Sequence, residues 1–307
     1  MKFEVTILGS SSATPTLNRN PTSQLINYSE QLFLVDCGEG TQSQLNKYGL
    51  KKAKINHIFI SHLHGDHYFG LMGLLSSLHL GGRQMPMYLF GPEPLIEIIN
   101  IQLKHSKTRL RYDLHFKATD PKNSEIIFEN DLIEVRTIPL RHKIDTTGFL
   151  FKEKPRPRKI DSTEIDRKNI PLDFRPLLKK GHDYTDKNGQ IIKNEDLTFS
   201  PPPPRSYAFC SDTCFLEEII PLIKNVDLLY HEATFLHELK ARAKETRHTT
   251  AKEAGIIAKM ANAKQLLIGH FSARYKSPTP LLEECKKEFE NSLVAEEGIT
   301  FSIEDVI

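Results

Sequence analysis

The sequence predicts a layered α/β protein with one basic insertion, and three observations support this fold class. Short apolar runs alternate with helical segments in both halves of the 307-residue chain, as expected of strands and helices stacked in layers. Polar side chains suited to chemistry repeatedly follow the ends of these apolar runs. Between residues 152 and 200 this rhythm gives way to basic and proline-rich sequence.

Composition sets limits on partners and compartment. Hydrophobic residues make up 39% of the chain, enough for a sizeable core, and the formal net charge is only +2, which names no partner. No apolar run approaches the ~20 residues that span a bilayer, and the first strand carries Glu4 where a signal peptide would be apolar. We therefore expect a cytoplasmic protein without a membrane partner. The cysteines are scattered and are expected to be reduced thiols; they are Cys37, Cys210, Cys214 and Cys285.

The first half reads as strands separated by helices. Apolar runs predict strands over residues 3–8, 31–36, 55–60, 86–92, 112–117, 125–128, 131–139 and 148–151. Helical spacing predicts helices over residues 42–48, 68–80 and 93–104. The second of these would begin just after His67 and point its N-terminus at that residue's surroundings.

The second half resumes the rhythm after the insertion. Strands are predicted over residues 205–213, 226–234 and 264–270, and helices over 249–261 and 279–289, with Thr249 or Thr250 as a cap. Residues 152–180 of the insertion hold ten Lys or Arg against five Asp or Glu, a local charge of +5. Two interpretations stay open for 152–200: a disordered insertion, or a basic arm that grips a polyanion.

Residues 61–67 carry four potential metal ligands directly after an apolar run. His62 and His64 are two positions apart, so at a strand end they point to the same side, and Asp66 and His67 follow across Gly65. Imidazoles and a carboxylate are the ligands of catalytic zinc sites. A polar surface turn is the alternative, but a turn has no use for three imidazoles.

More candidates follow the ends of later strands, and such ends cluster at one edge in layered folds. The candidate metal ligands are His62, His64, Asp66, His67, His142, Asp212 and His270. Seven are too many for one ion but suit two if a carboxylate bridges, and Asp212 is the candidate bridge. Two metals ~3.5–4 Å apart can hold a hydroxide and clamp a phosphodiester. His248 is either a capping or surface residue or a proton donor, with Glu232 holding its ring.

Several runs resemble the ribonuclease Z family of the metallo-β-lactamase superfamily. The spacing of His62, His64, Asp66 and His67 is the superfamily signature. More specific runs are Asp36-Cys37-Gly38-Glu39-Gly40-Thr41-Gln42, Phe209-Cys210-Ser211-Asp212-Thr213, His231-Glu232-Ala233-Thr234, Arg247-His248-Thr249-Thr250 and Gly269-His270-Phe271-Ser272-Ala273-Arg274-Tyr275. The loop over residues 15–20 also matches; taken alone it is either a solvated loop or a phosphate-binding loop with Arg19.

The resemblance implies a single domain over residues 1–307, folded as a four-layered αβ/βα sandwich, with residues 152–200 as an exosite arm for tRNA. It implies a zinc-dependent endoribonuclease that cuts precursor tRNA after the discriminator nucleotide, leaving a tRNA 3′-hydroxyl and a trailer 5′-phosphate. One zinc would take His62, His64 and His142, the other Asp66, His67 and His270, with Asp212 shared. Manganese or iron would also suit these ligands.

The resemblance also implies catalytic roles for Asp66, His248 and Glu232, and a homodimer in which one subunit's arm serves the other's site. RNA contacts are expected from Arg19, Asn20 and Arg274 near the site and from Arg175, Lys179 and Lys180 on the arm. Arg175-Pro176 stands where the family has Gly-Pro at the arm's tip, a departure that bears on tRNA docking.

Overall fold

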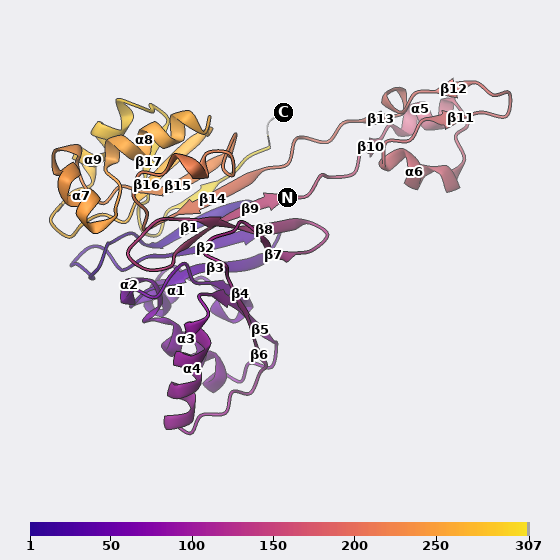
Figure 1. Ribbon diagram of the computed structural model, residues 1–307. Coiled ribbons are helices and arrows are strands. Elements are labelled where there is room, and N and C mark those ends of the chain that lie inside the picture. Colours follow the sequence, from indigo (N-terminus) through magenta and orange to yellow (C-terminus); the bar gives the residue numbers. More distant parts are fainter. Residues whose placement is uncertain (306–307) are drawn as a thin grey trace.

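Two seven-stranded β-sheets pack face to face in the computed structural model, which describes residues 1–305, and helices cover both outer faces (Figure 1). The first sheet runs in the order β18 (Thr300–Ser302), β1 (Phe3–Gly9), β2 (Ser23–Tyr28), β3 (Gln31–Cys37), β4 (Ile55–Phe59), β5 (Met87–Gly91) and β6 (Leu114–Ala118). The second runs in the order β17 (Ser292–Val294), β16 (Gln265–Gly269), β15 (Leu228–Glu232), β14 (Ser206–Cys210), β9 (Thr147–Glu153), β8 (Ile133–Pro139) and β7 (Ile126–Glu129). This is the four-layered sandwich that the sequence predicts.

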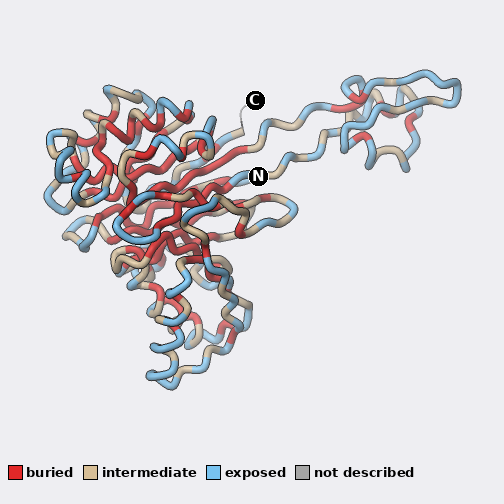
Figure 2. The backbone as a smooth tube through the Cα atoms, in the orientation of Figure 1, coloured by how far each residue is buried: buried red, intermediate tan, exposed pale blue. Residues whose placement is uncertain are grey.

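Alternation along the strands builds the layers. In β3, Phe33 and Val35 join the apolar cluster between the sheets, while Leu34 joins the cluster under the helices of the first sheet. In β15, Tyr230 faces the inter-sheet cluster and Leu229 faces the helices of the second sheet. Strands buried on both faces read as continuous apolar runs, as these do. The buried tube through both sheets in Figure 2 follows this pattern.

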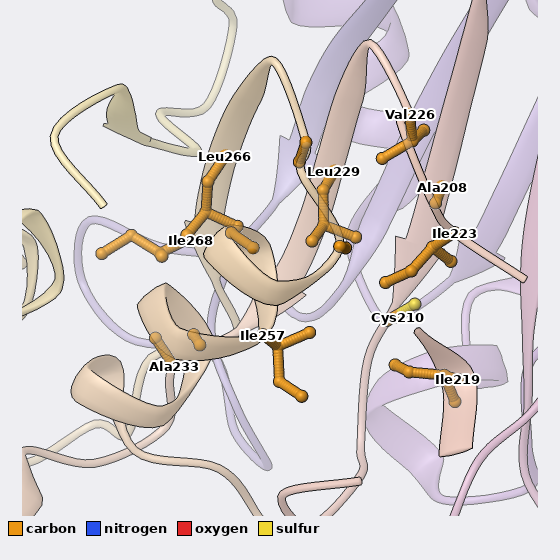
Figure 3. Close-up of a cluster of buried hydrophobic side chains, with 14 of the residues drawn as sticks. Ala208, Cys210, Ile219, Ile223, Val226, Leu229, Ala233, Ile257, Leu266 and Ile268 are labelled. Carbon is orange, nitrogen blue, oxygen red and sulfur yellow. The ribbon is translucent and has the colours of Figure 1, made fainter. Parts of the chain in front are cut away.

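Helices close the two outer faces. The first sheet is covered by α1 (Thr41–Lys47), α3 (Leu71–Leu80) and α4 (Pro94–His105), and the second by α8 (Ala251–Met260) and α9 (Thr279–Lys286), with α7 (Lys240–Thr246) beside them. Ile257 of α8 lies among Leu229 and Leu266 of the second sheet (Figure 3). Fully burying such a side chain is worth ~1.5–3 kcal/mol. Thr250 caps α8 in a capping box with Glu253, as predicted.

The single helix predicted over residues 68–80 is wrong. The chain forms a short α2 (Gly65–Tyr68) and then α3, with a break at Phe69 and Gly70. The Gly70 amide donates to the carbonyl oxygen of Cys37 at 2.9 Å, and a Cβ at Gly70 would lie 2.2 Å from the carbonyl oxygen of Gly38. This close approach of two backbones turns the chain, and the helix whose start faces the strand ends is α2.

The insertion is folded, so the disordered interpretation is wrong. It contains β10 (Lys159–Ile160), α5 (Ser162–Arg167), α6 (Arg175–Lys179), β11 (Tyr184–Thr185), β12 (Ile191–Ile192) and β13 (Thr198–Phe199). These elements enclose a small core of Ile165, Ile170, Leu178 and Leu197. Two extended segments carry this unit away from the sandwich (Figure 1).

Several short elements were not predicted, among them β2, β17 and β18. Short 3₁₀ helices complete the structure: η1 (Lys52–Lys54), η2 (Leu172–Phe174), η3 (Asn194–Asp196), η4 (Glu217–Ile219) and η5 (His237–Leu239). All four cysteines are free, and three of them are buried. None of the helices in residues 1–305 has the length and apolar character to span a membrane.

Candidate metal centre and active site

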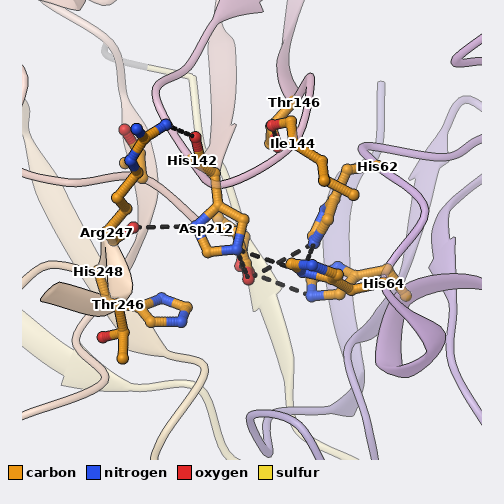
Figure 4. A network of polar contacts seen from close by, with 12 residues as sticks. His62, His64, His142, Ile144, Thr146, Asp212, Thr246, Arg247 and His248 are labelled. Atoms are coloured by element: carbon orange, nitrogen blue, oxygen red, sulfur yellow. Dashed lines mark hydrogen bonds and ion pairs between the residues drawn. The ribbon is translucent and has the colours of Figure 1, made fainter.

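Loops at one edge of the sandwich bring the predicted ligands together. His62 and His64 follow β4, His142 follows β8 and Asp212 follows β14 (Figure 4), and His270 follows β16. Asp212 and His270 adopt left-handed backbone angles, with φ of 59° and 57°. Such angles are uncommon for residues other than glycine and are found at functional sites, where the surrounding fold enforces them.

One group of donors contains three histidines and one oxygen of Asp212. His62 Nε2 and His142 Nε2 lie 3.1 and 3.2 Å from His64 Nδ1. The same two nitrogens lie 3.6 Å from Asp212 Oδ2. Four donor atoms define six interatomic distances, and four of these distances therefore measure between 3.1 and 3.6 Å.

A second group forms around the other oxygen of Asp212. Its Oδ1 lies 3.1 Å from His67 Nε2 and 3.0 Å from His270 Nε2. Those two nitrogens are 3.4 Å apart. Asp66 Oδ2 lies 3.5 Å from the first and 3.4 Å from the second. Asp212 thus offers one oxygen to each group.

These spacings fit the donor set of a divalent metal. Ligands ~2.0–2.1 Å from a tetrahedral ion lie roughly 3.3–3.4 Å from one another. Burial alone would raise the pKa of Asp212, but His270, His67 and His62 hold that pKa well below its usual range. The pKa of Asp66 is likewise lowered against the effect of burial, by His67 and then by a hydrogen bond from His270. Both carboxylates are therefore anionic donors at neutral pH.

A second layer of groups fixes the ring of each histidine that offers Nε2. Asp36 Oδ2 lies 2.6 Å from His67 Nδ1 and also accepts from the Ser61 hydroxyl at 2.9 Å. The remaining pairs are His62 with the Ser61 hydroxyl, His142 with the Arg247 carbonyl and His270 with the Thr234 hydroxyl. Partners of this kind set ring tautomer and orientation. Asp36 and Thr234 were not predicted to have a role, although both lie within the runs that carry the family resemblance.

His248 lies beside both groups, with its ring 4.9 Å from that of His142 and 5.3 Å from that of His270, and it is paired with Glu232. Its Nδ1 is 3.0 Å from Glu232 Oε1, and Glu232 is completely buried. Glu232 also accepts from the Thr213 and Thr249 amides at 2.6 and 3.0 Å. Burial opposes a charge on His248, but the charge and hydrogen bond of Glu232 raise the pKa of His248 to about 9. A protonated His248 is therefore available as an acid.

A cavity of about 510 Å³ opens over these groups. His64, Asp66, Asp212 and His248 line it, and the rest of its wall comes partly from residues 12–15. This loop is tied to the centre, because the Ala13 amide donates to Asp66 Oδ2 at 2.7 Å. The cavity is a place where a substrate would meet both donor groups and His248 together.

The residues predicted to bind RNA lie outside this cavity. Arg19 donates to the Tyr275 carbonyl at 2.6 Å, and the Asn20 side chain donates to Glu297 at 2.8 Å. Arg274 is exposed, with its guanidinium 4.9 Å from the centre of the Phe235 ring. The other three, Arg175, Lys179 and Lys180, lie on the arm, far from the site in the same chain (Figure 1).

Comparisons with known proteins agree with this architecture. A family model described as "Anti-Pycsar protein Apyc1" matches residues 3–156, which end before Asp212, His248 and His270. Ribonuclease Z of Phocaeicola vulgatus is 49% identical, over 99% of each chain. Ribonuclease Z of Porphyromonas gingivalis is 46% identical, over 98% of this chain and 99% of its own.

Among solved structures, human tRNase Z, short form, has a TM-score of 0.71 and 28% identity, covering 98% of this chain and 99% of its own. YhfI of Bacillus subtilis, a metallo-β-lactamase fold protein, has a TM-score of 0.70 and 18% identity, which bears on the fold alone. The matches to ribonuclease Z extend over both donor groups, the His248–Glu232 pair and the arm. The chain therefore belongs to the ribonuclease Z family, the tRNA 3′-endonucleases of the metallo-β-lactamase superfamily.

Proposed function

We propose that this chain is a metal-dependent endoribonuclease that hydrolyses the phosphodiester after the discriminator nucleotide of precursor tRNA. The products are a tRNA with a 3′-hydroxyl and a trailer with a 5′-phosphate. The observation that carries the proposal is the pair of donor groups that share Asp212, at spacings that suit two divalent ions, zinc first among them.

Two bound ions would supply an activated water and neutralise charge on the phosphate. The chain's own residues do the rest. Asp66 takes a proton from the attacking water as the new P–O bond forms. His248 gives its proton to the 3′-oxygen as the P–O3′ bond breaks, so protons and charge balance. Glu232 holds the His248 ring, with its Nδ1 side occupied and Nε2 free for the substrate.

The arm is the proposed tRNA exosite. Lys179 and Lys180 are exposed at the end of α6, and Arg175 at its start makes only a long 3.7 Å contact with Asp166. Such cations supply the sequence-independent part of RNA binding. Because the arm extends away from its own active site, we propose a homodimer in which it holds a tRNA bound at the partner subunit, in the cytoplasm.

The first experiment is cleavage of a precursor tRNA by the zinc-loaded protein, with both new ends mapped. Cleavage elsewhere than after the discriminator, or none, contradicts the proposed function. Size-exclusion chromatography with light scattering tests the dimer separately.

The rival is a phosphodiesterase of small substrates on the same fold. Replacing residues 159–199 with a short Gly-Ser linker leaves the sandwich intact, because Lys159 pairs with Phe199 at the arm's base. This variant should lose precursor-tRNA cleavage yet still hydrolyse bis(p-nitrophenyl) phosphate. Unchanged tRNA cleavage by the variant contradicts the role of the arm.

A further inference from the structure

A second cavity, of about 610 Å³, opens beside the catalytic cavity, and His64 lines both. We call it the side cavity. Its apolar wall comes from Leu63 after β4, Pro92 after β5, Pro94 at the start of α4, and Ile144 between β8 and β9. Its volume falls within the ~300–1,000 Å³ of small-molecule sites. Neither donor group fills this space. The side cavity is therefore a candidate binding site.

The lining of the side cavity selects against phosphate. Two exposed carboxylates, Glu93 and Asp145, lie among its residues, and none of the described residues that line it is Lys or Arg. Like charges repel a phosphodiester. Apolar side chains with hydrogen-bond acceptors nearby instead suit a neutral, flat group that carries N–H or O–H donors. A nucleoside has this chemistry.

The rings of His64, His142 and His248 form a row. The position of the side cavity along this row indicates which side of the scissile bond the nucleoside occupies. The His64 and His142 rings are 5.0 Å apart, and the His142 and His248 rings are 4.9 Å apart. Ile144 and His64 line the same cavity, and in Figure 4 both lie to the right of His142, whereas His248 lies to its left. The side cavity is therefore at the end of this row that is remote from the proton donor.

The opposite end of the row has a net positive charge. A cavity of about 260 Å³ borders His248 and is lined by Lys240, Lys244 and Glu253, with Lys240 paired with Glu253 at 3.4 Å. Cations there suit the phosphates of the tRNA 3′ strand, whose 3′-oxygen leaves toward His248. The trailer is joined to the same phosphorus as the tRNA. It therefore lies toward the other end of the row, at His64.

We propose that the side cavity binds the base of the first trailer nucleotide. The proposal rests on the proposed function and deepens it, because it makes the enzyme hold the trailer as well as the tRNA. Leu63, Pro92 and Ile144 would contact the faces of the base, and Asp145 would accept a hydrogen bond from the nucleoside. Losing the buried contacts of one base in an apolar site lowers kcat/KM by roughly tenfold or more.

The test uses the zinc-loaded full chain and precursor tRNAs that carry one abasic position each. The abasic position is the first trailer nucleotide, the third trailer nucleotide or the discriminator. We expect kcat/KM to fall about tenfold or more for the first trailer position, and markedly less for the third. Equal losses at the first and third positions overturn the proposal, provided that the unmodified precursor is cleaved. Absent cleavage of the unmodified precursor is instead a failure of the proposed function.

Two variants link the effect to the cavity. Ile144→Ala trims a wall residue that is 39% exposed, and Ile101→Ala trims a 49% exposed isoleucine of α4 as the matched control. Ile144→Ala should shrink the penalty at the first trailer position by about fivefold, because it removes part of the apolar contact with the base. Ile101→Ala should leave it unchanged. The proposal is also overturned if Ile144→Ala alters the penalty at the discriminator instead.

Discussion

Replacing Glu153 by glutamine should destabilise the protein at the root of the arm. Glu153 ends β9, where the chain leaves for the arm, and Arg205 precedes β14, where the chain returns. Their side chains are 0% and 3% exposed, and Glu153 Oε1 lies 2.6 Å from Arg205 Nη2. Arg156 adds a contact of 2.8 Å to the same oxygen and also pairs with Asp305. The substitution leaves two guanidinium groups without their shared buried carboxylate.

The expected loss is about 3–5 kcal/mol, the cost of removing one partner from a buried ion pair. At ~2.1 cal/mol/K per residue, the unfolding entropy of a 307-residue chain is about 0.64 kcal/mol/K. The midpoint of thermal unfolding should therefore fall by about 5–8 °C, as the ratio of the two quantities.

The loss should depend on pH in a defined direction. Burial alone would raise the pKa of Glu153, but hydrogen bonds from Arg205 and Arg156 hold it below its usual value. A group whose pKa is lowered by folding contributes stability above its unfolded pKa of roughly 4.3, and loses it as the pH falls through the folded value. The difference between wild type and Glu153→Gln should be full at pH 7 and narrow below about pH 4.

Circular dichroism melts at pH 7 and at about pH 3 measure both effects. Glu129→Gln is the control, because Glu129 pairs with Lys154 at 2.9 Å on the surface, with side chains 58% and 33% exposed. That pair should contribute less than about 1 kcal/mol. The two variants could instead melt within 1–2 °C of each other, roughly the scale of a surface pair. In that case the ion pairs of Glu153 do not contribute the expected 3–5 kcal/mol to stability.

Three further predictions concern the centre. His248→Ala should retain bound metal and lower precursor cleavage by about 10²–10⁴-fold, as loss of a general acid does, and wild-type rates would exclude this role. Asp36→Asn, which replaces the partner of His67, should weaken metal binding by about 10–100-fold with activity restored at high zinc, and an unchanged zinc titration would contradict this. Chelation should lower the melting temperature of wild type but not of Asp212→Ala, since the proposed ions would bind the folded chain and Asp212 contacts both donor groups; an equal shift in both would refute a shared ligand.

Elements with strong apolar patterns were predictable, and elements defined by contacts were not. Strands such as β4 and β15 are buried on both faces and appear as apolar runs. In β2, Ser23 and Gln24 are buried polar residues, which breaks the pattern of a core strand. The small core of the arm could not be predicted for a different reason. Its members are spread from Ile165 to Leu197, so no local periodicity reveals them.

The residues of the candidate site also divide into those that the sequence reveals and those that only the fold reveals. Residues that offer metal-binding atoms at strand ends are visible in the sequence, because both residue type and position carry the signal. Asp36 is equally buried and touches His67, yet a lone aspartate after a strand has many other uses. Glu297 is a similar case. It fixes Asn20 through hydrogen bonds of 2.5 and 2.8 Å across 277 positions, and only the fold brings the two together.

The centre is a product of sheet packing rather than of any one motif. Residues 61–67 supply His62 and His64 to one donor group and Asp66 and His67 to the other, so this loop alone completes neither. The second sheet supplies Asp212 to both, through a residue whose backbone is held at a φ of 59°. Each group therefore has its full set of donors only when the two sheets are packed. The His248–Glu232 pair forms within the second half of the chain, between the end of β15 and the start of α8, and the packing of the sheets brings this pair beside the donors of residues 61–67.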